Sequence, residues 1–535
     1  MTTWDAVVVG AGPNGLVAAN RLLDAGWSVL LLEAQPDVGG AVRSDREVHP
    51  DFVTDTFSAF YPLAATSPTI TSFDLESHGL VWRHAPSVLG HPMPDGSWAV
   101  LHRDREMTAA GLDAHHPGDG EAWLEMCSQW DRVGPHLIGS LLTPFPPLRH
   151  GAGLLASLRH VGGLDFVKTM LTPAGELTRK RFGSEAARVL VAGNAAHADI
   201  PLEAPGSGLI GMLLAMLGQT VGFPVPEGGA GELTQAMARR FRAAGGEIRT
   251  NAEVTRIDVR DRRVTGVRTA DGQVHSVRRA VIADVLAPAL YTQLLDASEV
   301  PTSVRAALQS FELDPGTVKV DWALDGPIPW TGAPELPAGT VHIADSVADM
   351  TLAMSQVQAG AVPAAPFMLS GQMTSTDPGR SPAGTESFWA YAHVPQRTGS
   401  DAGDGSIRGT WDRDDCERFA DRMQARLERL APGFGTRVLA RRVLGPRELQ
   451  ARDANLVGGA LNGGTAQLHQ QLVFRPLPGL GRAETPIRGL FIGSASAHPG
   501  GGVHGACGDN AARAALWHAR AGRLLPGAAR RVLGR

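Results

Sequence analysis

The chain has 535 residues, of which 43% are hydrophobic and 19% charged, enough for two or three domains with sizeable cores. A formal net charge of −5 excludes the basic surplus that a nucleic-acid-binding protein needs, so we expect no nucleic-acid partner. The three cysteines, Cys127, Cys416 and Cys507, are far apart, which excludes a disulfide scaffold, a zinc ribbon and a Cys-x-x-Cys redox pair.

The N-terminus lacks the pattern of a secretion signal, because Asp5 stands where the apolar region would begin and Ala6–Val9 is only as long as a strand. No stretch reaches the roughly 18 uninterrupted apolar residues of a transmembrane helix. Scattered cysteines are typical of a reducing compartment. We therefore expect a cytoplasmic protein with no metal site.

The first predicted elements form a βαβ unit. Trp4–Val9 is a β-branched apolar run typical of a buried parallel strand. Residues 13–25 have helical periodicity, and Ser28–Leu32 predicts a second strand that ends at Glu33.

Residues 100–220 have a mainly helical pattern, with long apolar faces in 152–171 and 206–217. We interpret these faces as core helices. The alternatives are that they line a lipophilic tunnel or contact a membrane surface peripherally.

The second half of the chain begins with a strand-rich stretch whose members are separated by turn signals such as Asp271-Gly272. The predicted strands are Glu247–Thr250, Glu253–Val259, Val264–Thr269, Val274–Ser276, Ala280–Ala283 and Gly316–Leu324. Residues 326–340 and 357–384 are rich in Pro, Gly and Ala and predict irregular loops. After a charged amphipathic helix at 412–430, the chain ends with a strand, Gly489–Gly493, a glycine-rich loop and a helix, Asn510–Ala521.

The segment Gly10–Gly15 fits the pattern G-x-G-x-x-G in the context that a dinucleotide requires: a buried strand before it, a helix after it, and Glu33 18 residues past Gly15. Gly10 would make the tight turn, Gly12 would let the backbone approach a pyrophosphate, and Gly15 would allow helix and strand to pack. The helix N-terminus attracts the phosphates, and Glu33 would bind the ribose hydroxyls.

The same pattern recurs at Gly206–Gly211, but no strand precedes it, so we interpret that match as a loop leading into a core helix. Gly39–Arg43 offers bare backbone and a guanidinium to a second phosphate approach, which favours FAD over NAD. The third match lies within Gly489–Gly508, where a helix start could stabilise negative charge at a flavin pyrimidine edge.

In combination, these motifs and the segment Gly222–Leu233 resemble the phytoene desaturase-like (carotenoid/retinoid-type) family of FAD-dependent oxidoreductases. The resemblance implies an α/β fold: a Rossmann-type FAD-binding domain, similar to those of glutathione reductase and amine oxidases, with an interleaved α+β substrate domain. It implies a discontinuous FAD domain (1–75, 220–300 and 470–535) and a substrate domain (76–219 and 301–469). Carotenoid desaturases commonly have Pro where this chain has His504, which argues against a carotenoid substrate more than against the cofactor.

The motifs and the resemblance together give a set of expected FAD-binding residues. They are Gly10, Gly12, Pro13, Asn14, Gly15, Glu33, Ala34, Gly39, Gly40, Ala41, Arg43, Val254, Gly493, Ser494, Gly501, Gly502, Val503, Gly505 and Ala506.

Three further residues are candidates for catalysis. Only three of the 49 basic residues are Lys, and one of them, Lys319, lies in an apolar strand. The resemblance implies a Lys that points at flavin N5; the alternative is a surface-facing strand Lys. His498 and His504 flank the glycine cluster and could act as base or substrate anchor, or could instead pack and cap.

The sequence therefore predicts an FAD-dependent dehydrogenase or desaturase that moves a hydride from a C–H of an apolar or polycyclic small molecule to flavin N5. A flavin amine oxidase, a redox-neutral flavin-dependent isomerase and a non-catalytic escort protein on the same fold are the alternatives.

Overall fold

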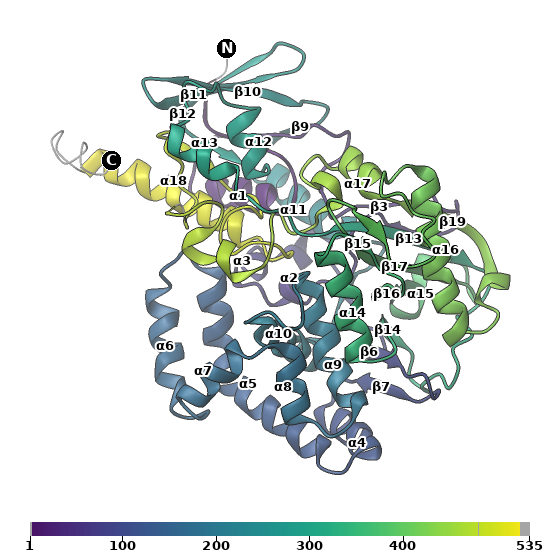
Figure 1. The fold of residues 1–535 in the computed structure, drawn as a ribbon. Coiled ribbons are helices and arrows are strands. Elements are labelled where there is room, and N and C mark those ends of the chain that lie inside the picture. Colours follow the sequence, from purple (N-terminus) through teal and green to yellow (C-terminus); the bar gives the residue numbers. More distant parts are fainter. Residues whose placement is uncertain (1–2, 480, 525–535) are drawn as a thin grey trace.

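The computed structural model describes residues 3–479 and 481–524. Two seven-stranded sheets organise the molecule, and a group of helices lies below the first sheet and beside the second in the view of Figure 1. Within the described ranges, no helix combines the length and hydropathy that crossing a bilayer requires.

The first sheet joins segments that are far apart in the sequence. Its path runs β10-β11-β12-β1-β2-β9, with β20 paired to β12. The strands are β1 (Thr3–Val9), β2 (Val29–Leu32), β9 (Glu247–Arg249), β10 (Val254–Arg260), β11 (Arg263–Thr269), β12 (Val274–Ala283) and β20 (Leu490–Ile492). β1 pairs in parallel with both β2 and β12. The predicted strands at 274–276 and 280–283 are one continuous strand, β12, because Val277 continues the pairing to β1.

Both faces of this sheet are covered, which explains the continuous apolar runs of its strands. Val8 and Ile282 pack in one core with helices α1 (Pro13–Asp24), α11 (Gly231–Ala243) and α18 (Ala506–Leu524). Val7 and Val281 point to the opposite core, with α12 (Ala287–Thr292) and α13 (Thr302–Leu308). The chain is an α/β protein with a Rossmann-type domain.

The second sheet has the order β19-β13-β17-β16-β14-β6-β7. Its strands are β6 (Ser87–Pro92), β7 (Trp98–Leu101), β13 (Gly316–Leu324), β14 (Ala338–Ile343), β16 (Met368–Gln372), β17 (Glu386–Val394) and β19 (Val438–Leu444). One of its faces packs against α16 (Arg413–Leu430) through residues such as Trp322 and Phe419. Shorter pairs are β3 (Ser44–Asp45) with β4 (Thr54–Asp55), β5 (Trp82–Arg83) with β8 (Val225–Pro226), and β15 (Ala361–Val362) with β18 (Ser400–Asp401).

The prediction of irregular loops at 326–340 and 357–384 is wrong in part. β14 begins inside the first range, and β16 and the short helix α15 (Met373–Thr376) lie inside the second. Neighbouring strands bury both β14 and β16 completely, so pairing across the sheet overrides a composition rich in Gly and Ala.

Helices fill the region between the sheets and the lower end of the molecule (Figure 1). They are α2 (Pro62–Thr66), α3 (Pro68–Thr71), α4 (Arg105–His115), α5 (Asp119–Leu142), α6 (Leu148–Leu158), α7 (Leu164–Leu171), α8 (Ala174–Arg181), α9 (Glu185–Ala195), α10 (Ser207–Thr220), α14 (Val347–Gln358) and α17 (Pro446–Arg452). The core interpretation holds for α10, where Met212 and Leu217 are buried. It holds only in part for α6, which buries no residue completely but packs Leu154 and Leu158 against the core. The domain boundaries stay a prediction, and residues 525–535 of the last segment lie outside the described ranges.

Candidate active site

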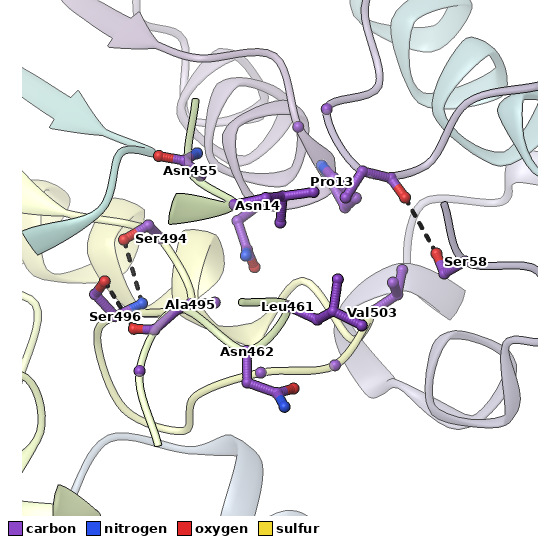
Figure 2. Close-up of a pocket in the computed structure, with 18 of the residues that line it drawn as sticks. Pro13, Asn14, Ser58, Asn455, Leu461, Asn462, Ser494, Ala495, Ser496 and Val503 are labelled. Atoms are coloured by element: carbon purple, nitrogen blue, oxygen red, sulfur yellow. Dashed lines mark hydrogen bonds between the residues drawn. The ribbon is translucent and has the colours of Figure 1, made fainter. Parts of the chain in front are cut away.

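A cavity of about 980 Å³ extends from the first βαβ unit to the second sheet and to helices α7 and α10. Figure 2 shows Pro13 and Asn14 on one side of this cavity, opposite Leu461, Asn462 and Val503. The N-terminal loop, the segment after α17 and the C-terminal glycine cluster therefore meet around a single space.

The loop after β1 fits a pyrophosphate. Gly10 has φ +94°, and a Cβ at this position would lie 2.8 Å from the carbonyl oxygen of Asp284. A Cβ on Gly15 would overlap the carbonyl oxygen of Gly10 at 2.0 Å, so helix α1 can pack on β1 only with glycine there. Gly12 is the N-cap of α1, and both it and Gly40 line the cavity with bare backbone. The start of α1 thus offers a dipole and an uncrowded surface to an anion.

Glu33, directly after β2, lies in the position that a ribose-binding acid requires. Its side chain lines the cavity, and its two oxygens accept hydrogen bonds from the backbone N–H of Ala11 at 2.7 Å and of Gln35 at 2.9 Å. Burial raises the pKa of Glu33, although these two bonds oppose the shift. Each oxygen keeps a second lone pair that can accept a ribose hydroxyl.

Asp284, at the end of β12, is a residue that the motif search missed. Its Oδ2 accepts a hydrogen bond from the backbone N–H of Gly15 at 2.8 Å. Burial, with Asp453 and Glu33 nearby, raises the pKa of Asp284 to about 8, so the carboxyl is mainly neutral at pH 7. A neutral acid next to the helix N-terminus does not repel phosphates. The position of Asp284 directly after β12 was the available signal. Because β12 pairs in parallel with β1, the two strands end at the same edge of the sheet, next to the glycine loop.

Arg43 does not take the position expected of a phosphate-binding guanidinium. It donates hydrogen bonds to the carbonyl oxygens of Gly40 at 3.0 Å and Arg452 at 2.7 Å, and it is absent from the described cavity lining. Its positive charge instead lowers the pKa of Glu33 and Asp453, against the larger effect of their burial. The structure therefore corrects the expected direct contact to a role behind the loop.

Most of the expected FAD-binding residues do line the cavity. They are Gly10, Gly12, Pro13, Asn14, Glu33, Ala34, Gly40, Ala41, Val254, Ser494, Gly501, Gly502 and Val503. Gly15, Gly39, Gly493, Gly505 and Ala506 lie behind this lining. A Cβ on Gly39 would come within 2.5 Å of the carbonyl oxygen of Val42, and a Cβ on Gly493 within 2.9 Å of Ile282, so these glycines allow close packing.

Lys319, on β13, lines the cavity and is only 2% exposed, so the alternative of a surface-facing Lys is wrong. Its Nζ donates to the carbonyl oxygen of Asp55 at 2.9 Å and forms an ion pair with Asp321. Burial lowers the pKa of Lys319, and the attraction of Asp321 opposes this shift. Asp321 is held in turn by Arg442, at 2.9 Å.

His498 and His504 both line the cavity, but backbone groups hold them. His504 Nδ1 accepts a hydrogen bond from the backbone N–H of Ala506 at 3.0 Å, at the start of α18, and burial lowers its pKa to about 4. His498 Nε2 lies 3.0 Å from the carbonyl oxygen of Thr143, and burial lowers its pKa too. For His504 the geometry favours capping of the helix over proton transfer. The catalytic roles of both stay predictions.

Comparison with known proteins adds two family matches. Residues 8–73 match the NAD(P)-binding Rossmann-like domain, and residues 167–336 match the flavin containing amine oxidoreductase family. The chain is 28% identical to mouse (Mus musculus) pyridine nucleotide-disulfide oxidoreductase domain-containing protein 2, over 95% of this chain and 92% of that protein. It is 27% identical to a phytoene desaturase (lycopene-forming) of Pseudescherichia vulneris, over 95% and 98% of the two chains.

Together these matches support a phytoene desaturase-like family of FAD-dependent oxidoreductases. The chain is an enzyme of this class, and its cofactor is FAD. A solved structure of putrescine oxidase superposes with a TM-score of 0.61 at 16% identity and covers 97% of this chain and 99% of that one, which shows the shared fold.

Within this family assignment, the substrate side of the cavity contains residues that no short motif could identify. β13, β16 and β17 contribute Lys319, Leu369 and Tyr391, which pair across the sheet in one row. Helices α7 and α10 contribute an apolar wall: Val167, Met170, Leu209, Ile210, Leu213 and Leu214. The apolar wall comes from the faces at 152–171 and 206–217 for which a lipophilic lining was the alternative, whereas Leu369 and Tyr391 join Lys319 only through long-range strand pairing.

Proposed function

We propose that this enzyme is a dehydrogenase or desaturase that removes a hydride from a C–H of an apolar or polycyclic metabolite. FAD, when bound, supplies the hydride acceptor at flavin N5. A proton leaves the neighbouring substrate atom, so a C=C or C=N bond forms. The protein positions the two reactants and excludes water from them.

The continuity of one cavity is the observation that carries this proposal. The same space is lined by Gly12 and Glu33 at one end and by Leu213 and Met170 at the other. An apolar wall of this kind binds a substrate mainly through burial of its apolar surface, which fits a desaturase substrate better than a highly charged one. The name of the Pseudescherichia relative, a phytoene desaturase, supports the same substrate class.

Lys319 is the residue that we propose for catalysis. It is the one lysine of the three that lies in a strand of the cavity wall, and its ion pair with Asp321 keeps an ammonium group in a buried place. A buried positive charge stabilises negative charge far better than an exposed one, because less water screens it. Lys319 would therefore stabilise the charge that hydride transfer places at the reacting end of the cavity.

An amine substrate is a second candidate, and one observation favours it. The rings of Trp389 and Tyr391 both line the cavity and stack with centroids 6.0 Å apart and planes within 7°. Aromatic faces attract the ammonium group of an amine. Lys319 Nζ already lies 5.8 Å from the ring centroid of Trp389, however, and its positive charge would repel a protonated amine.

Anaerobic mixing of the FAD-loaded enzyme with candidate substrates tests the proposal. We expect apolar or polycyclic compounds to bleach the visible absorption of the flavin, whereas primary amines leave it unchanged. Bleaching by amines alone would favour the amine oxidase. Turnover of a substrate to an isomer with no net electron acceptor would favour the redox-neutral alternative, and a protein that binds such compounds without any flavin reduction would be an escort.

A further inference from the structure

Arg475 is a buried positive charge in the wall of the cavity. The residue is 1% exposed and belongs to the cavity lining. Two other arginines, Arg380 and Arg426, are buried to a similar degree, and each forms ion pairs with two aspartates. Arg475 forms no ion pair within the described ranges of the chain. Because a buried charge without a counter-charge is costly, this difference indicates a role for the charge itself.

Backbone carbonyl groups, which carry no net charge, occupy the guanidinium of Arg475. Its Nε donates a hydrogen bond to the carbonyl oxygen of Ala495 at 3.0 Å, its Nη1 to that of Thr465 at 2.9 Å, and its Nη2 to those of Asn462 and Ala495, both at 2.7 Å. Figure 2 shows two of these partners, Asn462 and Ala495, below Asn14 in its view. The carbonyl groups satisfy the N–H donors but leave the positive charge without a negative partner.

Arg475 keeps its charge at neutral pH. Burial lowers its pKa to about 10, which is still far above 7. The groups around it add no negative charge there, because burial raises the pKa of Cys507 to about 12 and lowers the pKa of both His498 and His504. Arg475 is therefore a cation among neutral side chains.

Asp314 is the acid whose charge acts on Arg475, yet the two do not pair. The carboxylate accepts hydrogen bonds from the backbone N–H groups of Leu461 at 2.6 Å and Asn462 at 2.9 Å, and it is absent from the described cavity lining. Burial and the neighbouring Asp199 raise the pKa of Asp314, which weakens its negative charge. The loop 461–465 is thus held by an anion at its N–H groups and by a cation at its carbonyl groups, and the cation is the one that lines the cavity.

The charge of Arg475 lies against the C-terminal glycine cluster. A Cβ on Gly500 would come within 3.1 Å of Arg475 Nε, and Gly501 and Gly502 line the cavity. Cys507, in the first turn of α18, contacts the carbonyl oxygen of Gly500. The guanidinium and the positive end of the α18 dipole therefore meet at the segment where the motifs predict the flavin pyrimidine edge.

We propose that Arg475 stabilises the negative charge that the bound flavin gains at its pyrimidine edge on reduction, and that it thereby raises the reduction potential of the cofactor. When a hydride moves, the C–H bond of the substrate breaks, an N–H bond forms at flavin N5, and the negative charge is delocalised over N1 and O2 of the ring. A buried cation acts strongly on this charge because little water screens it. The inference rests on the placement of FAD in the proposed function and does not depend on the substrate.

The reduction potential of the bound flavin, measured by equilibration with a reference dye, tests the proposal without any substrate. In Arg475→Met we expect the reduced flavin to be stabilised at least about tenfold less, which corresponds to a potential lower by about 30 mV for two electrons. Arg475→Lys keeps the charge and should retain most of the wild-type potential. Arg482→Met is the matched control, because it removes an exposed positive charge from the same segment, outside the described cavity lining, and its potential should be that of the wild type. An unchanged potential in flavin-loaded Arg475→Met would overturn the proposal.

A variant that releases the loop 461–465 could lose its FAD, and Arg475→Lys then decides. A potential close to that of the wild type in Arg475→Lys supports the proposal, whereas a decrease of about 30 mV or more despite the retained charge would contradict it. The wild type gives an independent readout: its photoreduced flavin should stay anionic to about one pH unit below the pH at which free reduced flavin takes up a proton. Near-ultraviolet absorption of the reduced flavin measures this, and titration at the same pH as free flavin would overturn the role of Arg475. A failure of the proposed substrate class would leave all of these measurements unchanged.

Discussion

The phosphate-binding cradle (Gly10, Gly12 and Gly15) and the apolar wall from α7 and α10 lie at opposite ends of one cavity and depend on opposite kinds of residue. The cradle is made of glycines on which a Cβ would come within 2.0–3.0 Å of a neighbouring atom. The apolar wall is made of larger side chains, such as Met170, Leu209 and Leu213, that line the cavity. A single added methyl group disturbs the cradle, whereas the apolar wall changes gradually as apolar area is removed. Substitution of a cradle glycine should therefore abolish FAD binding completely, whereas substitution in the apolar wall should change substrate turnover by degrees.

The largest effect is expected at Gly12. In Gly12→Val the new side chain begins 3.0 Å from Asp284 Oδ2 and enters the space of the pyrophosphate, so the purified protein should contain no FAD. Gly111→Val is the matched control, because a Cβ at this helical position meets nothing within 4 Å. Flavin absorbance per chain measures both variants. A fully flavinated Gly12→Val protein would refute the placement of the cofactor.

A smaller but still large effect is expected at Lys319. Lys319→Met should keep its FAD while flavin reduction or reoxidation slows by about 100-fold, because a buried charge at the reacting end is lost. Asp321 keeps its contact with Arg442 in this variant, which limits the damage to folding. Lys319→Arg should recover part of the rate, and Lys168→Met should have none of this effect. Full rates in both half-reactions measured by stopped flow would remove the catalytic role.

Leu213 tests the apolar wall. Leu213→Trp would fill part of the cavity from α10, and we expect kcat/KM for an apolar substrate to fall by about tenfold with FAD content unchanged. Steady-state kinetics at equal flavin concentration measures the change. An unchanged kcat/KM would mean that the substrate does not use this part of the cavity.

The smallest effect is a pH dependence at Asp284. Its pKa of about 8 without ligand should rise further beside phosphates, so FAD binding takes up a proton and weakens as the pH increases above about 8. Asp284→Asn cannot ionise and should show a flatter dependence. The same raised pKa makes the native state bind more protons than the unfolded chain between pH of about 4 and about 8, so wild-type stability should decrease over that range. FAD fluorescence and urea unfolding across pH measure the two effects, and parallel curves for both proteins would exclude Asp284 as their source.

The sequence predicted the βαβ unit of the cradle correctly because its determinants are local. Gly10, Gly12 and Glu33 lie in one βαβ unit, where strand, turn and helix follow from adjacent residues. Arg43 shows the limit of this reasoning: its type and spacing fit a phosphate, but the carbonyl oxygens of Gly40 and Arg452 hold it behind the loop. The partner Arg452 is more than 400 residues away, beyond any local pattern.

The substrate end could be predicted only in outline. The alternation of Gly316–Leu324 identified β13, but its neighbours β17 and β19 come from later segments, so the surroundings of Lys319 depended on pairing that no local pattern encodes. For α6, the pattern indicated a helix with an apolar face, but it could not show that Leu154 and Leu158 would pack against the core while Leu148 and Leu155 stay exposed.

Anaerobic reduction of the bound flavin by an apolar substrate tests the central claim most directly, because it requires both ends of the cavity to work together. The account predicts that the FAD-loaded wild type is bleached by such a substrate, that Leu213→Trp is bleached more slowly, and that one double bond appears in the substrate for each flavin reduced. A wild-type flavin that stays oxidised with every apolar compound but is bleached by amines would contradict it.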